Sequence, residues 1–381
     1  MTDVKKLFLI FLSWRLILFL PLFLGSVFIP IRQDFPYVFF SYYASKNSIL
    51  TNYLISSWAN FDGAHYILIA SFGYTTSGGF FPLFPLAINV ASSLFLEKIV
   101  SIEPIVYYVA LVLSSIYFFL AMYVFFKLIC LDYSKKIAWK SILHLLLFPT
   151  SFFFACIYTE GLFLFLSLCS FYFARKKRWL ISSLFAFLLG MTRFVGIAIV
   201  PALIAEFLIQ KQSFKKGWPL IFSPLGLLGY GLYNYIKWHD FFYFIHAQGT
   251  FLNNRSVTSI VLPLQTLYRY VKILLTVSIF QFEFWISFLE LSSFFFASYL
   301  IYIGFKKKIR LSYLIFSLIA FLIPVSSGTL SALPRYVLPL FPLFIVISQI
   351  KNRWITVTYF LISSILLFIL LAFFSRGYYV A

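Results

Sequence analysis

Residues 7–30 read LFLIFLSWRLILFLPLFLGSVFIP, an apolar stretch that holds one charged residue, Arg15. About 20 such residues in a helix cross the roughly 30 Å hydrocarbon core of a bilayer. The stretch is longer than the apolar region of a signal peptide, which has about 7–15 residues, and it lacks a small-residue cleavage site. We therefore expect a retained first membrane helix, in which Arg15 is structural or faces lipid and extends its charge toward the interface.

Similar apolar runs recur to the C-terminus, and the composition of the whole chain agrees with them. Of the 381 residues, 62% are hydrophobic, 52 are phenylalanine and only 11% are charged. Soluble domains carry about 25% charged residues, so this chain could not form a soluble surface. Lipid offers no hydrogen bonds to the backbone, so every backbone N–H and C=O group must find its partner within the protein. We therefore expect helices. The sequence thus predicts an all-α polytopic membrane protein with one domain over residues 1–381.

The formal net charge of +19 comes from short basic clusters at the ends of apolar runs. A nucleic-acid partner would favour one basic stripe instead, so we expect none. Clusters of Lys and Arg mark the cytoplasmic side of a membrane protein. These clusters are Lys5-Lys6, Lys135-Lys136, Arg175 to Arg178, Lys211 with Lys215-Lys216, Lys306 to Arg310, and Lys351 with Arg353. The region around Asp62 then lies outside.

An outside Asp62 and an inside Lys135 require an odd number of crossings between them, yet two apolar stretches occur there, at 81–97 and 104–130. The first is the shorter and begins with Pro82 and Pro85, which interrupt a membrane helix near its start. We therefore assign 81–97 to a short helix on the outer surface. The remaining spans, with the first, make eleven: 104–130, 137–157, 161–175, 179–192, 195–210, 217–237, 284–305, 311–331, 334–350 and 354–374.

This topology places the unusual polar residues on one side. The outer ends of spans and the outer segments hold Asp62, Glu160, Arg193, Asp240 and Arg335, whereas the cytoplasmic turns hold little besides Lys and Arg. Two larger outer segments, 31–103 and 239–283, could cover a site there. The sequence therefore predicts a site that faces outward, with its active-site motif in the first segment.

Asp62 is the strongest candidate, because only 11 carboxylates serve the whole chain. It lies in W58ANFDGAHYILIASFGY74, where it could simply cap the helix that follows. Helical spacing also puts Asp62, His65 and Tyr66 along one side of that helix. An acid, an imidazole and a phenol together indicate a polar site, and ionisable groups at membrane depth are functional by default. For His65 alone, a satisfied hydrogen-bonding role stays open.

A further acid, Glu160, carries alternative interpretations. In P149TSFFFACIYTEG161, Thr159 could be an N-cap and Glu160 could answer the positive end of the helix. Glu160 could equally take part in catalysis, orient a sugar hydroxyl or pair with a basic residue. Tyr158 and Asp240 are candidates for positioning substrate hydroxyls.

Arg193 and Arg335 are candidates for binding a phosphate. Each stands at the outer end of an expected span without a neighbouring acid in sequence, and a guanidinium suits phosphate oxygens through two parallel hydrogen bonds. Pro334 would open a helix whose N-terminus itself attracts anions. Arg193 could alternatively only stabilise the end of the preceding helix through its dipole.

The order of these motifs resembles a known family. The matching residues are Trp58, Phe61-Asp62-Gly63, Tyr66, Ile69-Ala70 and Gly73-Tyr74, then F80FPLFPL86, Pro149, Tyr158-Thr159-Glu160, Leu162-Phe163, Thr192-Arg193, Gly196, Arg335-Tyr336 and Phe341-Pro342. Together they resemble the family of the second mannosyltransferase of GPI-anchor assembly and its prokaryotic relatives. That family belongs to the GT-C class of glycosyltransferases, which use polyprenyl-phosphate sugars. Phe61 and Phe84 depart from the Trp and Tyr that are usual there, which puts the exact sugar in doubt more than the class.

The resemblance implies a catalytic base at Asp62, an extracytoplasmic or lumenal active site, and a polyprenyl (dolichyl-type) phosphate hexose donor. Mannose is the expected sugar and a lipid-linked or glycan molecule the expected acceptor. A small accessory membrane subunit is conceivable. The membrane would be the plasma membrane in a prokaryote and the endoplasmic reticulum in a eukaryote.

The chemistry fits this implication, because a sugar on a polyprenyl phosphate already carries its leaving group. The enzyme needs a carboxylate to take the acceptor proton and cations to stabilise the departing phosphate. A single displacement inverts the anomeric centre. No close cluster of acids suitable for Mg²⁺ or Mn²⁺ occurs in the outer segments, so we expect no metal cofactor. Two alternatives stay open at this point: a transporter or flippase for lipid-linked sugars, and an oligosaccharide ligase.

Overall fold

The computed structural model describes residues 2–32, 54–75, 78–96, 102–250 and 255–381. Within these ranges the regular structure is helical and contains no β-strand, which confirms the predicted all-α class. The α-helices are α1 (Asp3–Ile17), α2 (Phe19–Phe28), α5 (Asp62–Phe72), α6 (Leu83–Leu96), α7 (Ile102–Ile129), α8 (Lys135–Leu146), α9 (Glu160–Arg175), α10 (Trp179–Gly190), α11 (Ile199–Ile209), α12 (Leu225–Trp238), α13 (Tyr243–His246), α14 (Pro263–Thr276), α15 (Phe282–Lys306), α16 (Leu311–Val325), α17 (Leu333–Val337), α18 (Phe341–Ser348) and α19 (Arg353–Ser375).

Four helical stretches in the described residues are long and apolar enough to cross a membrane. They are Asp3–Phe28, formed by α1 and α2, Ile105–Ile129 of α7, α15 and α19. Four shorter apolar helices accompany them, at Leu83–Leu94, Trp179–Gly190, Phe194–Ile209 and Leu311–Val325. These helices support a multi-pass integral membrane protein. The total of eleven spans stays a prediction.

Several of the expected spans are not continuous α-helices, among them 137–157 and 334–350. The stretch 137–157 begins in α8, which ends at Leu146, and continues through turns and the 3₁₀ helix Ser151–Phe154 to the start of α9 at Glu160. The stretch 334–350 divides into α17 and α18. Proline explains both interruptions, because Pro149 and Pro339 lack the N–H that a continuing helix would need.

The buried turns between α8 and α9 obtain hydrogen bonds from other parts of the chain. The Thr150 hydroxyl donates to the carbonyl of Pro334 at 2.9 Å, and the Ile157 N–H donates to the carbonyl of Trp58 at 2.9 Å. Irregular backbone at membrane depth is tolerated where protein surrounds it in this way. These bonds bring the segments before α5, before α9 and within α17 to one place.

Aromatic packing makes this meeting point rigid. Phe152, Phe153 and Phe154 are each at most 1% exposed. The ring of Phe154 stacks on that of Phe118 in α7 at 4.2 Å between centroids, and Phe153 meets Phe374 of α19 edge-on at 5.3 Å. Such aromatic pairs contribute about 0.5–1.5 kcal/mol each beyond the area they bury. The residues that begin α9 are therefore held firmly between two long helices.

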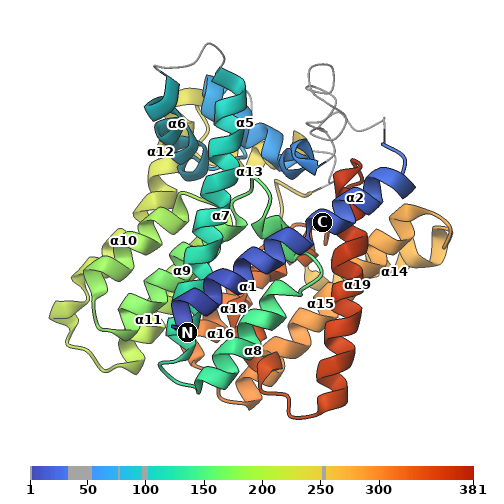
Figure 1. Cartoon of the computed structure of the whole chain (residues 1–381). Helices are drawn as coiled ribbons and strands as arrows, with labels where there is room; N and C mark the ends of the chain where they lie inside the picture. Colours follow the sequence, from blue (N-terminus) through green and yellow to red (C-terminus); the bar gives the residue numbers. More distant parts are fainter. Residues whose placement is uncertain (1, 33–53, 76–77, 97–101, 251–254) are drawn as a thin grey trace.

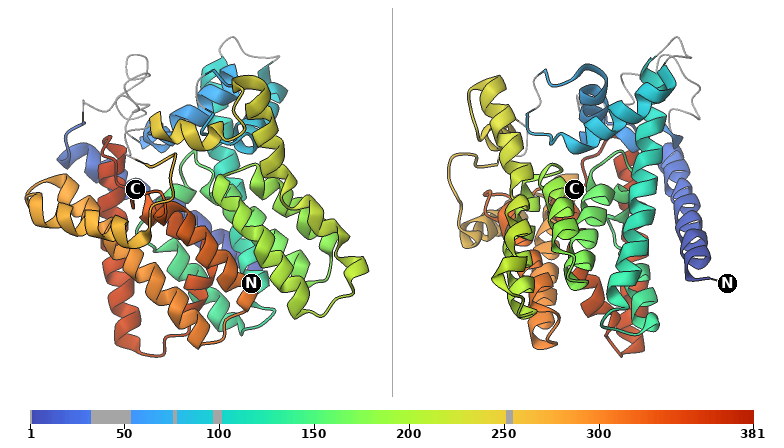
Figure 2. Two further views of the ribbon diagram at one scale, coloured as in Figure 1. Left: turned by 180° about the vertical axis from the view of Figure 1, so that it is seen from behind. Right: turned by 90° about the vertical axis from the view of Figure 1, so that its left-hand side faces the viewer.

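The short helices gather at one end of the bundle. Figure 1 shows α5, α6 and α13 at the end opposite the N-terminus, and both views of Figure 2 agree. The predicted surface helix over 81–97 corresponds to α6, a helix of 14 residues. The opposite end carries ion pairs between Lys135 and Asp3, and between Arg175 and Asp132. Which end faces outward stays a prediction.

Candidate active site

Asp62 begins α5 at a strained point of the backbone. The preceding residue, Phe61, has φ 57° and ψ −116°, a region that bulky residues rarely occupy. Such strain costs about 1–3 kcal/mol and persists only where the surroundings enforce it. Here the ring of Phe61 packs against Phe374 and Tyr379, with centroids 5.5 and 5.6 Å away. The strained turn fixes the backbone position from which the Asp62 side chain extends.

Tyr158 holds the same turn from the other side. Its hydroxyl donates to the carbonyl of Asn60 at 2.8 Å and accepts from the Asp62 N–H at 3.2 Å. The Asn60 amide in turn donates to the carbonyl of Phe374 at 2.9 Å. The buried phenol of Tyr158 thus acts on the backbone of the aspartate, and it does not line the cavity described below.

An ion network joins four residues that are distant in sequence. Nη1 of Arg335 lies 2.7 Å from Oδ2 of Asp62, and its Nε lies 3.4 Å from Oε1 of Glu160. Nη1 of Arg193 donates to the same Oε1 at 2.7 Å. The two arginines lacked neighbouring acids in sequence, but the fold supplies one to Arg193 and two to Arg335. Glu160 thus pairs with basic residues, and it also lies in the first turn of α9.

The network sets the charge state of Asp62. Burial alone raises the pKa of its carboxyl, but the guanidinium of Arg335, with smaller contributions from His65 and Arg193, outweighs burial and leaves the pKa below the ordinary value. The group is therefore a carboxylate at neutral pH. Its side chain is 28% exposed, whereas that of Glu160 is fully buried.

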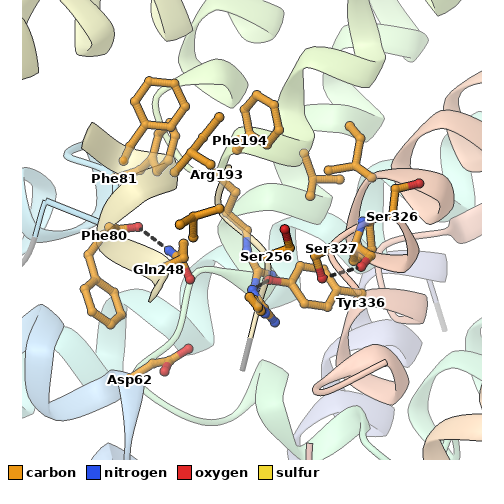
Figure 3. A pocket seen from close by; sticks show the side chains of 18 of the residues that line it. Asp62, Phe80, Phe81, Arg193, Phe194, Gln248, Ser256, Ser326, Ser327 and Tyr336 are labelled. Atoms are coloured by element: carbon orange, nitrogen blue, oxygen red, sulfur yellow. Dashed lines mark hydrogen bonds between the residues drawn. The ribbon is translucent and has the colours of Figure 1, made fainter. Parts of the chain in front are cut away.

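A cavity of about 680 Å³ lies beside the network. Asp62, Arg193 and Arg335 line it, while Glu160 lies behind the arginines. Figure 3 shows Asp62 and Phe80 on one side of this cavity, and Ser256, Ser327 and Tyr336 together on the other. Further apolar residues complete its wall, namely Phe81, Phe194, Phe244, Ile319, Leu322 and Ile323. One cavity thus offers both a charged surface and an apolar surface.

Two residues predicted beside Asp62 on α5 also line the cavity. The imidazole of His65 stacks on the ring of Phe80 at 4.6 Å between centroids. Burial lowers its pKa and the nearby Asp62 raises it, with a net lowering, so the ring is neutral at neutral pH. The hydroxyl of Tyr66 lies 3.5 Å from Oγ1 of Thr159. The predicted common side of Asp62, His65 and Tyr66 is confirmed by their shared cavity.

Asp240 lies elsewhere. Its Oδ2 is 2.6 Å from Nδ1 of His246, and its Oδ1 accepts from the Phe242 N–H at 2.9 Å. It therefore organises the turn before α13, and it is not among the residues that line the cavity. The interpretation of Asp240 as a residue that positions substrate is not supported by this placement, because a local turn already uses both of its oxygens.

Sequence reasoning gave no role to two important residues of the cavity, Tyr336 and Arg255. The ring of Tyr336 lies 5.0 Å from the guanidinium of Arg193, 5.5 Å from that of Arg255 and 6.0 Å from that of Arg335. Nη1 of Arg255 also donates to the Tyr336 hydroxyl at 3.2 Å. The available signal for Arg255 was an arginine in the outer segment 239–283 with no acid close by in sequence.

The short helix α17, which carries Arg335 and Tyr336, is positioned by a buried acid. Ala332, at φ 65°, turns the chain into α17, and its N–H donates to Oε1 of Glu290 at 3.1 Å. The Tyr270 hydroxyl donates to the other oxygen of Glu290 at 2.6 Å. Glu290 therefore fixes the start of the helix that presents the arginine to Asp62.

No group of three or more His, Cys, Asp or Glu side chains suited to a metal ion occurs in the described part of the chain. The prediction of a metal-independent reaction is not tested by this finding. What the cavity offers chemically is one ionised carboxylate beside several guanidinium groups, enclosed by apolar side chains.

This arrangement can be compared with known proteins. The family described as mannosyltransferase (PIG-V) matches residues 4–215, more than half of the chain. The chain belongs to the PIG-V mannosyltransferase family. The recognition from sequence motifs is thereby confirmed, as is the prediction of a glycosyltransferase. A comparison with curated proteins found no match.

The residues matched by the PIG-V family model include only part of the site. The matched residues include Asp62, Glu160 and Arg193, whereas Arg255 and Arg335 lie beyond the match. The structure nevertheless places Arg335 against Asp62 and Glu160. The second half of the chain therefore completes a site whose acids come from the first half.

Proposed function

We propose that this protein moves a hexose, with mannose as the first candidate, from a polyprenyl (dolichyl-type) phosphate to a lipid-linked or glycan acceptor. The observation that carries the proposal is the ionised Asp62 carboxylate at the wall of an arginine-lined cavity. A base and a phosphate-binding surface are the two elements that this transfer needs.

The reaction proceeds in one displacement. The acceptor hydroxyl oxygen bonds to the anomeric carbon while the bond between that carbon and the donor phosphate oxygen breaks. The electron pair leaves with the polyprenyl phosphate, and the hydroxyl proton passes to Asp62. Attack opposite the leaving group inverts the anomeric centre. No metal enters this scheme, since arginines supply the positive charge that the departing phosphate requires.

Arg193 and Arg335 stabilise the phosphate within this scheme. Each is held by a carboxylate, Arg193 by Glu160 and Arg335 by Asp62 and Glu160. A guanidinium has five N–H donors, so these contacts leave donors for a ligand. Glu160 contributes by fixing both guanidiniums, and Tyr158 by fixing the Asp62 backbone.

His65 and Tyr66 contact the substrate from the cavity wall. A neutral imidazole and a phenol at this wall suit sugar hydroxyls, because each both donates and accepts hydrogen bonds. The apolar side chains opposite suit the lipid part of the donor. Asp240 has no part in this scheme, because its oxygens serve the turn before α13.

The site faces the extracytoplasmic or lumenal side in this proposal, since the basic clusters mark the opposite end as cytoplasmic. Single cysteines at Thr75 and Ser134, both exposed, test the orientation in a background without the three native cysteines. An impermeant reagent added from outside should label the first and not the second. The reverse pattern would overturn the orientation.

A transfer assay tests the activity. The purified full-length protein in lipid nanodiscs receives labelled polyprenyl-phosphate mannose and a glycolipid extract, and the label is followed into the acceptor. The proposal expects an α-linked product from a β-linked donor, and no product from Asp62→Asn. Movement of intact donor across proteoliposomes without transfer would favour a flippase. Transfer of a preassembled oligosaccharide, but no single hexose, would favour a ligase.

A further inference from the structure

Arg255 differs from the two arginines that the sequence singled out. Arg193 and Arg335 each form an ion pair with a carboxylate. Arg255 instead donates through Nη1 to the Tyr336 hydroxyl and through Nη2 to the carbonyl of Ser331, both at 3.2 Å. Among the described residues, no carboxylate lies within ion-pair distance of Arg255.

The charges around the cavity are consequently unequal. Three guanidiniums surround Tyr336, whereas two carboxylates, Asp62 and Glu160, pair with only two of them. Arg255 is partly buried, and withdrawing a charge from water without a charged partner is costly. An anionic ligand in the cavity would remove that cost, and Arg255 is the cation without a carboxylate to compete for its contacts.

The backbone prepares Arg255 for this contact. The loop that carries it is tied to the end of α16, because the Ser256 N–H donates to the carbonyl of Ser327 at 2.8 Å and the Val261 N–H donates to that of Ser326 at 3.0 Å. Ser256 and Ser327 lie beside Tyr336 at the cavity wall in Figure 3. The loop is thus fixed before a ligand arrives, which lowers the entropic cost of binding.

From these contacts we infer that Arg255 and the Tyr336 hydroxyl bind the phosphate of the donor lipid. The inference rests on the proposed function and extends it to Arg255, which neither the sequence motifs nor the family match includes, and to Tyr336, which lies beyond the family match. When the sugar leaves, the phosphate passes from a diester with one negative charge to a monoester that carries about 1.5 to 2. The positive charge of Arg255, unmatched by a carboxylate, would stabilise this additional charge as it develops.

Arg193 and Arg335 then have a different main task. Their carboxylate partners hold them at the boundary between the phosphate and Asp62, so they orient the reacting groups while adding to the field. Arg255 supplies the net charge that holds the phosphate. The same chemistry could bind the anionic headgroup of a membrane phospholipid, and the experiment must separate these two sources.

The test measures binding of dolichyl phosphate, which is the leaving group without its sugar. The full-length protein in phosphatidylcholine nanodiscs is titrated with dolichyl phosphate and, separately, with dolichol, and binding is followed by tryptophan fluorescence. Loss of a hydrogen-bonded charged contact should weaken dolichyl phosphate binding by about ten- to hundredfold in Arg255→Gln. Dolichol, which lacks the phosphate, should bind wild type and variant equally.

Three further variants sharpen the result. Arg269→Gln is the matched control, because Arg269 donates to the carbonyl of Gly328 at 2.9 Å and does not line this cavity. It should bind dolichyl phosphate as wild type does. Tyr336→Phe should weaken binding less than Arg255→Gln, since it removes a hydroxyl and no charge. If Arg255→Gln fails to fold, Arg255→Lys retains the charge without the planar fork and should show intermediate binding.

The outcomes separate this inference from the proposed function. If wild type neither binds dolichyl phosphate nor transfers sugar, the proposed function fails and the inference fails with it. If wild type binds and transfers but Arg255→Gln or Arg255→Lys binds dolichyl phosphate as tightly, the inference alone is overturned. A further outcome is that phosphatidylglycerol competes equally well with dolichyl phosphate and that its binding depends on Arg255 in the same way. That result would assign Arg255 to a phospholipid headgroup site and would also overturn the inference.

Discussion

Two ion networks lie at opposite ends of α9, and each is built around a fully buried glutamate. At the cavity end, Glu160 pairs with Arg193 and Arg335. At the other end, Glu206 accepts from Arg310 at 2.7 and 2.6 Å, from Ser312 at 2.6 Å and from Gln210 at 2.5 Å. Arg175, the last residue of α9, adds an ion pair to Glu206 at 3.7 Å.

The networks differ in how completely they satisfy their buried atoms. Both oxygens of Glu206 accept hydrogen bonds, whereas Oε2 of Glu160 has no hydrogen-bond partner among the described residues. A fully satisfied polar network stabilises a fold and specifies its packing. An incompletely satisfied network beside a cavity retains capacity for a ligand. We therefore interpret the Glu206 network as structural and the Glu160 network as functional.

The largest expected effect on the transfer rate comes from substituting Asp62, which belongs to the network at the cavity. Asp62→Asn keeps the shape of the side chain but removes its ability to take a proton, so transfer should fall by about 10² to 10⁴. Donor binding and folded yield should stay near wild type. Single-turnover rates with equal amounts of folded protein check this. Retained turnover would mean that the base lies elsewhere and that Asp62 only caps α5.

The two glutamates should respond in opposite ways to the same change. Glu206→Gln leaves Arg310 without its carboxylate and should cost about 3–5 kcal/mol of stability, with little change in the transfer rate per folded molecule. Glu160→Gln should instead lower transfer by about ten- to hundredfold, because it loses the charged hydrogen bond from Arg193 and the ion pair with Arg335. Its loss of stability should be smaller, because among the described residues Glu160 accepts one hydrogen bond, from Arg193, whereas Glu206 accepts four.

Thermal unfolding and transfer rates of both variants, measured side by side, decide this contrast. Equal losses of activity in the two variants at equal folded protein would contradict it. So would a Glu160→Gln protein with full activity and a strongly lowered melting temperature.

Conservative changes of the arginines should separate donor from acceptor. Arg193→Lys and Arg335→Lys keep the charge but lose the planar fork of donors. We expect the donor concentration for half-maximal transfer to rise by about tenfold, and the acceptor requirement to stay constant. Separate titrations of donor and acceptor give both values, and alanine variants should lose more. A selective rise in the acceptor requirement would assign these arginines to the acceptor.

The pH dependence of transfer should report the contact between Arg335 and Asp62. A protonated Asp62 cannot accept the acceptor proton, so activity falls as the pH drops through the pKa of this carboxyl. In the wild type, Arg335 outweighs burial and holds that pKa below its ordinary value. Arg335→Gln removes this cation, so burial should raise the pKa and move the acid limb of the rate profile to higher pH. An acid limb at the same pH in both proteins would argue against Asp62 as the titrating group.

The smallest effect is expected away from both networks. The ion pair of Asp240 and His246 is partly exposed, and such pairs contribute about 0–1 kcal/mol. Asp240→Asn should therefore leave transfer and stability close to wild type. A loss of activity comparable to that of Glu160→Gln would return Asp240 to the set of residues that position substrate.

Much of the fold class and part of the site could be predicted from the sequence. The apolar runs and the scarcity of charge predict a helical membrane protein, because these properties are local and summed along the chain. Asp62, His65 and Tyr66 could be placed together for the same reason, since helical spacing is local. Arg193 and Arg335 drew attention as polar exceptions in apolar surroundings, and Pro334 predicted that a helix opens at Arg335.

The remaining features depend on contacts between distant parts of the chain. The sequence placed Glu160, Arg193 and Arg335 on one side and allowed Glu160 to pair with a basic residue. It did not indicate which arginines would meet Glu160, because the three residues stand in separate elements. Arg255 escaped notice because its importance comes from its place beside Tyr336 and from the lack of an ion pair with a carboxylate among the described residues, which only the fold shows. The broken spans were misjudged because hydropathy does not register where Pro149 and Pro339 end a helix, even though both prolines were visible.

The strained backbone at Phe61 implies a conflict between thermal stability and catalytic turnover. Glycine reaches a positive φ at little cost, so Phe61→Gly would relieve the strain there, although it would also give up the contacts of the ring with Phe374 and Tyr379. The turn that aims Asp62 would gain freedom in the same substitution. A selection for thermal stability alone could therefore enrich flexible residues at position 61. The selected proteins would resist unfolding by heat but catalyse transfer slowly. Natural proteins often trade stability for activity in this way, and position 61 is where this chain would show it.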